Sequence, residues 1–131
     1  MATLLLDSNV IFDALNGKRN RAGYLQRLLA EGHLLACCAV NFTEVYAGLR
    51  DHEAQKTERF MNSLEVFPLT RDVAVFAGLL KREWSKKGIT LSYPDVTIAA
   101  VALFYAVPLL TDNRKDFPMQ DLHLFPLPDT F

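Results

Sequence analysis

Apolar and polar positions alternate along the chain in blocks that predict strands separated by helices. Short apolar runs bounded by polar residues or glycine predict five strands, at 3–6, 34–40, 66–69, 107–111 and 122–127. Pro68 has no amide hydrogen to donate, so we expect its strand at a sheet edge. The run at 34–40 is apolar on both faces, which is typical of a buried parallel sheet.

The segments between these runs carry apolar residues at helical spacing. They predict helices at 10–15, 21–31, 41–49, 53–64, 72–87 and 96–105. Gly32 and Gly88 follow two of these helices as natural stops, and Ser92 precedes the last helix as an N-cap with Pro94 in its first turn. This alternation predicts an α/β sandwich with a mostly parallel central sheet.

Composition makes this picture more specific without indicating a function. The chain has 131 residues, 50% of them hydrophobic, which suffices for one domain with its own core, and we expect residues 1–131 to be that domain. We find no internal repeat, linker or low-complexity segment. The formal net charge of -1 neither indicates nor excludes a protein that binds nucleic acid.

Two further features bear on the compartment. Cys37 and Cys38 are adjacent in a predicted strand, where successive side chains point to opposite faces, so they are poorly placed to bridge each other and we expect reduced thiols. The apolar run Leu4–Leu6 is too short for the core of a signal peptide, and no later run reaches the length of a membrane helix. These features predict a soluble cytoplasmic protein that does not enter a membrane.

Candidate chemistry lies in the acidic residues at the junctions between strands and helices. Asp7 ends the first strand, Glu44 lies four residues past the second, and Asp116 lies six past Leu110. Ligands of open α/β sheets collect at the carboxyl ends of the strands, which is where these junctions fall. Asp95 lies in the first turn of a helix whose remainder is almost wholly apolar, so only its start is expected to face a cleft.

A purely structural interpretation of the same acids is helix capping. Asn41, Ser92 and Asn113 each precede an acid by three residues, a spacing typical of helix N-termini, and Asp7 alone could be a turn residue. Capping and metal binding are compatible, because a helix N-terminus favours the ionised carboxylate that a hard divalent cation requires.

The candidate acids fall in four short motifs: Leu6-Asp7-Ser8-Asn9, Thr43-Glu44-Val45-x-x-Gly48, Asp95-Val96-x-Ile98-Ala99-Ala100 and Thr111-x-Asn113-x-x-Asp116-Phe117. In order and spacing these motifs resemble those of PIN-domain ribonucleases, in particular of the VapC branch, the toxins of type II toxin–antitoxin pairs. Each motif is weak alone, but together they extend from Leu6 to Phe117. The resemblance implies a PIN-like three-layer α/β/α sandwich.

The resemblance also implies the site and its chemistry. Its acidic metal ligands would be Asp7, Glu44, Asp95 and Asp116. Ser8 and Asn113 would orient a carboxylate or a metal-bound water, and Asp112 is an alternative to Asp116 as the fourth ligand. The implied reaction is hydrolysis of an RNA phosphodiester with Mg²⁺ or Mn²⁺, in which a metal-activated water needs no histidine or serine nucleophile.

Substrate and partner contacts are expected near the same acids. Arg114 and Lys115 are candidates for RNA contact, although such residues can also be solvated surface. The resemblance implies a homodimer and a VapB-type antitoxin whose C-terminal segment covers the acidic site. Phe42, Tyr46 and Leu49, beside Glu44, could form the receiving groove or could pack in the core.

Other activities fit the sequence less well. A phosphotransferase of the haloacid dehalogenase type needs a second acid where this chain has Asn9, and a receiver domain needs adjacent acids near its N-terminus. The motifs His-Glu-x-x-His and Gly-x-Ser-x-Gly are absent from the sequence, as is a glycine-rich phosphate loop. A nuclease acting on DNA or in RNA housekeeping, and a non-catalytic regulatory domain, remain open.

Overall fold

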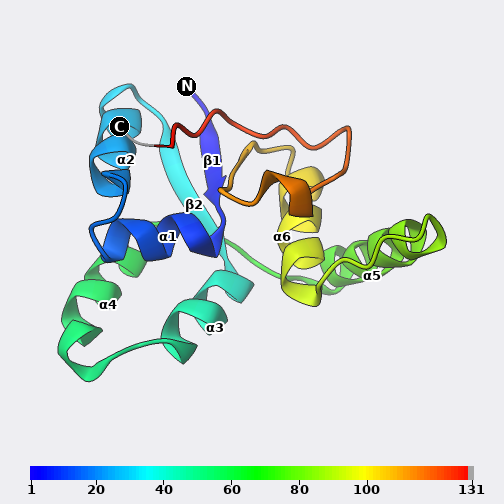
Figure 1. The fold of residues 1–131 in the computed structure, drawn as a ribbon, viewed down its shortest axis with the longest axis horizontal. Helices are drawn as coiled ribbons and strands as arrows, with labels where there is room; N and C mark the ends of the chain where they lie inside the picture. The colour runs from blue at the N-terminus through cyan, green and yellow to red at the C-terminus, as the bar shows by residue number, and fades with distance from the viewer. Residues whose placement is uncertain (130–131) are drawn as a thin grey trace.

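The computed structural model describes residues 1–129 and alternates strands with helices, as expected (Figure 1). The expected single domain extends to residue 131, so its last two residues lie outside the described part. In chain order the elements are β1 (Thr3–Leu6), α1 (Ser8–Leu15), α2 (Arg21–Ala30), β2 (Leu34–Cys38), α3 (Ala39–Ala47), η1 (Asp51–Glu53), α4 (Ala54–Asn62), β3 (Glu65–Phe67), α5 (Arg71–Lys86), α6 (Tyr93–Phe104), β4 (Leu109–Leu110) and η2 (Arg114–Asp116), where η marks a 3₁₀ helix.

The four strands form one parallel sheet in the order β3-β2-β1-β4. Leu4 pairs with Leu35, Leu6 with Leu110, and Cys37 with Val66 in register. The predicted parallel sheet is therefore confirmed, and so is the edge position of β3, which ends immediately before Pro68. Because all strands are parallel, the residues after β1, β2 and β4 emerge at one edge of the sheet.

Helices cover both faces of the sheet, which confirms the three-layer α/β/α architecture. Leu5, Ala36 and Cys38 pack with α5 and α6 in one core. The alternate strand positions, among them Leu4 and Cys37, pack with α1, α2, α3 and α4 in the other. In Figure 1, α1 and α2 lie on one side of β1 and β2, and α6 lies on the other. Cys37 and Cys38 thus face opposite cores, and both are free thiols.

Helix α6 is buried through its middle, and both of its ends are more exposed. Residues 98–102 are at most 1% exposed. The hydroxyl of Ser92 accepts a hydrogen bond from the Asp95 amide at 3.2 Å, which confirms the predicted cap. Asp95 is half-buried in the first turn. The polar start of the helix therefore remains available at the carboxyl edge of the sheet.

The predicted strand at 122–127 is wrong. Residues 122–128, here called the C-terminal strap, form a single bridge between Leu109 and Leu124. The His123 carbonyl accepts from the Leu109 amide, and the Phe125 amide donates to the Leu109 carbonyl, both at 2.9 Å. Pro126 and Pro128 cannot extend this pairing because they have no amide hydrogen. In Figure 1 the strap crosses the molecule in red towards α2.

Several predicted boundaries also need correction. β2 ends at Cys38 rather than residue 40, because Cys38 is the extended N-cap residue of α3, which takes in Ala39 and Val40. β4 has two residues, Leu109–Leu110, instead of the predicted 107–111. The predicted helix at 53–64 is the shorter α4, preceded by η1. Among the described residues, every helix falls short of the length and apolar character that crossing a membrane requires.

Candidate active site

Asp7 is the most buried of the predicted site acids. It follows β1 directly, caps α1 and is 5% exposed. Its Oδ1 accepts from the Ser8 amide at 2.8 Å, and its Oδ2 accepts from the Thr111 hydroxyl at 2.7 Å. Its pKa is raised to about 6, first by burial and then by the negative charges of Asp95 and Glu44, against the hydrogen bonds that lower it. Asp7 is therefore fixed in direction but costly to ionise.

Two residues that orient Asp7 were not given this role by the sequence. Thr111 bonds Oδ2 from the end of β4, and the amide of Asn9 donates to the same oxygen at 3.3 Å. Both lie at the carboxyl edge of the sheet, so their position was the signal that could have found them. The predicted supporting residue Asn113 acts differently, because its backbone amide donates to the Thr111 hydroxyl at 3.0 Å.

Glu44 is held by two successive hydrogen bonds that begin at the buried Asn41. The Ser8 hydroxyl donates to Oε1 of Glu44 at 2.7 Å, and the Asn41 amide donates to the Ser8 oxygen at 2.9 Å. Asn41 is fully buried, and its Oδ1 accepts from the Cys38 amide at 2.8 Å. The capping interpretation of the sequence placed Asn41 at the start of its helix; in the structure Cys38 is the N-cap residue and Asn41 contributes to the cap from the third residue of α3.

Asp95 and Asp116 complete the group through their charges. The pKa of Asp95 is raised by burial first and then by the charges of Asp116 and Glu44. The charges of Asp95 and Glu44 also raise the pKa of Asp7. Each of the four predicted acids therefore interacts electrostatically with at least one of the others. Within residues 1–129, however, no three acidic, histidine or cysteine side chains converge closely enough to hold a metal ion. The four acids interact through their charges, but their side chains do not converge on one position.

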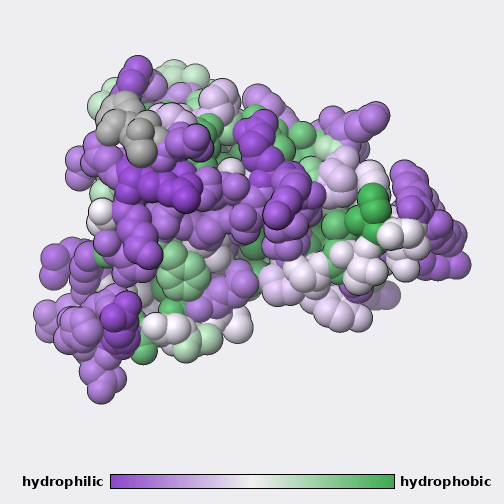
Figure 2. All heavy atoms as spheres, in the orientation of Figure 1, coloured by the Kyte–Doolittle hydropathy of each residue, from purple (hydrophilic) through white to green (hydrophobic). Residues whose placement is uncertain are grey.

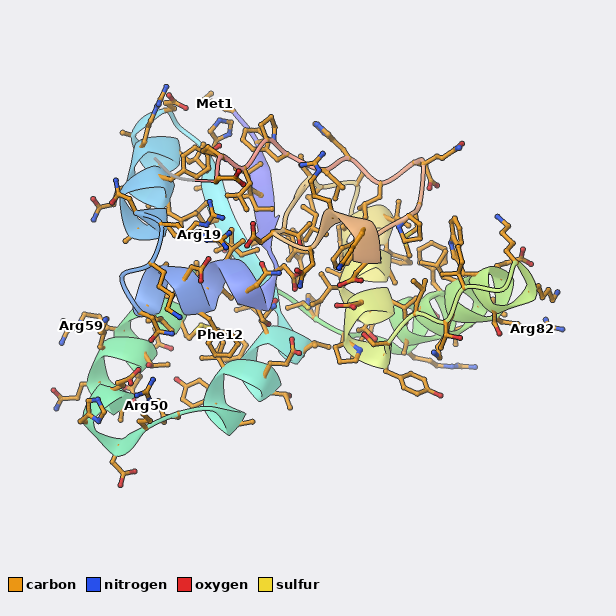
Figure 3. The ribbon with its side chains drawn as sticks, viewed as in Figure 1. Met1, Phe12, Arg19, Arg50, Arg59 and Arg82 are labelled. Carbon is orange, nitrogen blue, oxygen red and sulfur yellow. The ribbon has the colours of Figure 1, made fainter. Side chains whose placement is uncertain are left out.

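Asp112, the alternative fourth ligand, is occupied by arginines. Its Oδ2 lies 2.5 Å from Nη1 of Arg19, and its Oδ1 lies 3.2 Å from Nη2 of Arg21. Figure 3 shows Arg19 turned towards the middle of the molecule, whereas Arg50, Arg59 and Arg82 lie at its periphery. Asp116 lies half-buried in η2, and its charge acts on Asp95. Asp112 is thus paired with two arginines, whereas the charge of Asp116 acts on Asp95.

The remaining predicted residues lie around this group. Arg114 and Lys115 are exposed on η2, next to Asp116. Phe42 packs partly against the core beside α1, and its ring stacks on that of Tyr46 with centroids 6.4 Å apart. Tyr46 is 39% exposed. The ring of Phe42 thus contributes to the core, whereas the ring of Tyr46 remains partly at the surface.

The donor set of this site fits a hard divalent cation. Mg²⁺ and Mn²⁺ prefer oxygen ligands, and Asp7, Glu44, Asp95 and Asp116 offer only carboxylate oxygens. Burial and mutual repulsion raise the pKa values of Asp7 and Asp95, and a bound cation would offset both effects. The arrangement thus suits chemistry on a substrate that itself carries negative charge.

Comparison with known proteins gives consistent similarities. A family model described as PIN domain matches residues 4–119. Ribonuclease VapC19 of Mycobacterium tuberculosis is 30% identical over 115 residues, which cover 88% of this chain and 92% of that protein. Ribonuclease VapC2 of Rickettsia felis is 25% identical over 118 residues, covering 86% and 88%.

Solved structures agree in fold. VapBC2 of Rickettsia felis, bound to a DNA fragment from its promoter, matches with a TM-score of 0.80 at 22% identity, covering 94% of this chain and 97% of that one. DNA-bound VapBC of Salmonella typhimurium matches with a TM-score of 0.81 at 20% identity, covering 95% and 98%. A toxin–antitoxin complex of Klebsiella pneumoniae matches with a TM-score of 0.74 at 26% identity, covering 91% and 94%.

Proposed function

Because this chain belongs to the PIN-domain family, we propose that it is a divalent-metal-dependent endoribonuclease of the VapC type and the toxin of a type II toxin–antitoxin pair. The observation that carries the proposal is the group of four carboxylates at the carboxyl edge of the parallel sheet, coupled to one another by charge. Relatives named ribonucleases over nearly the whole chain support RNA as the substrate.

The site residues divide into the proposed metal ligands and the residues that orient these ligands by hydrogen bonds. Asp7, Glu44, Asp95 and Asp116 would hold Mg²⁺ or Mn²⁺, which when bound supplies an activated water and neutralises charge on the phosphodiester. Thr111 and Asn9 fix the direction of Asp7. Ser8, itself oriented by Asn41, fixes Glu44. These bonds prepare the carboxylates before substrate arrives, which limits the reorganisation that the reaction requires.

The partner of the protein follows from the same similarities. Structures of toxin–antitoxin complexes share this fold, so a VapB-type antitoxin is the expected inhibitor, and its contact would include the exposed ring of Tyr46. We further propose a cytoplasmic homodimer in which residues 1–131 form a single PIN domain. Arg114 and Lys115 are the proposed RNA contacts, because they are exposed beside Asp116.

Cleavage of a mixed single-stranded RNA tests the function directly. We expect cleavage with Mg²⁺ or Mn²⁺, none with EDTA, and none of a DNA strand of the same sequence. Asp7→Asn should abolish cleavage, whereas the matched control Asp72→Asn, in the exposed first turn of α5, should retain it. Folded protein that leaves RNA intact with either metal, or an active Asp7→Asn variant, would contradict the proposal, and cleavage of DNA alone would reassign the substrate.

A further inference from the structure

Arg21 is a buried cation that joins three separate segments beside the site. It is 1% exposed, although it carries a guanidinium group. Nη2 lies 3.2 Å from Oδ1 of Asp112, in the loop after β4, and Nη1 donates to the carbonyl of Pro128 in the C-terminal strap. Nε lies 3.5 Å from Oδ2 of Asp13 in α1, at ion-pair rather than hydrogen-bond range. A buried guanidinium is costly unless it is paired, so this position requires its acidic partners.

Hydrogen bonds lead from Asp112 to the catalytic Asp7. The backbone amide of Asp112 donates to Oδ1 of Asn9 at 3.2 Å, and the amide of Asn9 donates to Oδ2 of Asp7 at 3.3 Å. On the other side of the loop, Thr111 donates to the same oxygen at 2.7 Å. The loop 111–113 therefore controls both side-chain donors to Oδ2 of Asp7.

This loop has little other support from the sheet. β4 contributes only two residues, and the strap adds a single bridge beyond it. Arg19 also contacts Asp112, but its side chain is 47% exposed, and exposed ion pairs contribute little. Arg21 is buried and can use its planar fork, which suits simultaneous contact with several acceptors. The buried arginine is consequently the stronger anchor for the loop.

We propose that Arg21 and Asp112 are positioning residues of the nuclease site. Arg21 holds Asp112, and Asp112 sets the loop so that Thr111 and Asn9 point at Oδ2 of Asp7. The strap contributes through the Pro128 carbonyl, so a segment beyond the PIN-domain match supports the site. This inference assigns Asp112 a role distinct from metal ligation, and its kinetic test rests on the proposed ribonuclease function.

Steady-state kinetics on a short fluorogenic RNA separate positioning from ligation. Asp112→Asn keeps the backbone donor to Asn9 but loses the charge that Arg21 binds, so we expect kcat to fall about tenfold with KM within twofold of wild type. Arg21→Lys should behave alike, because an ammonium cannot make the forked contact. The double variant should have no lower kcat than the worse single variant, whereas independent effects would multiply. Unchanged kcat in Asp112→Asn, or activity as low as in Asp116→Asn, would overturn the proposal.

A second measurement needs neither metal nor activity. In ¹H–¹⁵N spectra of the metal-free protein, Asp112→Asn should shift the Ser8 amide, which donates to Asp7, and the side-chain amide of Asn9. The control Arg50→Ala, which removes the ion pair of an exposed arginine with Glu53, should shift neither signal. Unmoved signals in Asp112→Asn would overturn the positioning role. If wild-type protein fails to cut RNA, the proposed function fails, while these spectra still decide the role of Asp112.

Discussion

At the scale of single residues, Asp7 shows how burial and hydrogen bonding compete. Three donors contact its carboxylate, and each favours the charged form. Its pKa is nevertheless raised from 3.8 to about 6, because loss of hydration outweighs these bonds and the neighbouring acids add repulsion. Near neutral pH the metal-free protein therefore carries a destabilising charge at its proposed catalytic centre.

This destabilisation predicts how stability changes with pH. A folded-state pKa above the unfolded value means that the folded protein holds the proton more tightly. The contribution of Asp7 to stability is thus fully present below about pH 4 and is lost as pH rises through about 6. The loss amounts to about 3 kcal/mol at neutral pH. Urea unfolding in EDTA from pH 4 to 7 should show a clearly larger decline in wild type than in Asp7→Asn, where Asp95, whose pKa is also raised, still contributes.

The same comparison predicts the stability of the inactive variant. Asparagine removes the buried charge but cannot accept all three hydrogen bonds of the carboxylate, so the gain is partly offset. At pH 7 we expect the Tm of Asp7→Asn to be unchanged or raised by up to about 10 °C. A lower Tm for the variant, or parallel pH profiles for the two proteins, would show that the charge of Asp7 does not destabilise the fold.

Sequence reasoning found the acids of this site more easily than the groups that orient them. Asp7, Glu44 and Asp95 could be selected because acids at strand-to-helix junctions form a pattern along the chain. The roles of Asn41 and Thr111 depend on hydrogen bonds to Ser8 and Asp7, across 33 and 104 residues of sequence. Such contacts are set by the packing of the sheet, so no local spacing reports them.

At the scale of elements, the cap of α6 couples helix stability to the site. Ser92→Ala removes the acceptor for the Asp95 amide and should lower the free energy of unfolding by about 1 kcal/mol. Because Asp95 lies in the same turn, kcat should also fall. Thr70→Ala removes the corresponding cap of α5, where Thr70 accepts from Val73 at 3.3 Å.

Both the stability, by chemical denaturation, and kcat should be measured for these two variants. We expect similar losses of stability, but reduced kcat only in Ser92→Ala, since Thr70 caps a helix that contributes none of the four acids. Equal kcat in both variants would mean that Asp95 does not depend on its cap. An unchanged free energy of unfolding in Ser92→Ala would mean that water replaces the hydroxyl at this exposed position.

Helices and strands could be predicted where the hydrophobic periodicity agreed with the residues that start or stop an element. The predicted helix at 72–87 and α5 differ by one residue at each end. The end of the strand predicted at 34–40 was wrong, because β2 stops at Cys38 and α3 begins at Ala39. Hydrophobicity alone does not distinguish a buried strand from the first turn of a buried helix. The strap alternates like a strand, but its prolines and the short β4 beside it leave little to pair with.

At the scale of the whole molecule, the distribution of charge matters more than its sum. The face shown in Figure 2 is hydrophilic across its middle, and hydrophobic residues reach the surface mainly towards α5. The net charge is -1, and four acids gather at the proposed site. RNA must therefore be attracted by local cations at the rim rather than by a general positive field.

Arg114 and Lys115 are the cations through which we expect this attraction. Binding of a single-stranded RNA to the Asp7→Asn protein, followed by fluorescence anisotropy, keeps the RNA intact. Each phosphate contact contributes about 0.7 to the slope of log Kd against log salt concentration, so Arg114→Gln with Lys115→Gln should lower this slope by about 1.4. The control Arg82→Gln with Lys86→Gln, at exposed positions in the second half of α5, removes equal charge and should leave the slope unchanged. Equal effects of the two pairs would mean that RNA responds to overall charge, and the rim of the acid site would then have no special part in binding.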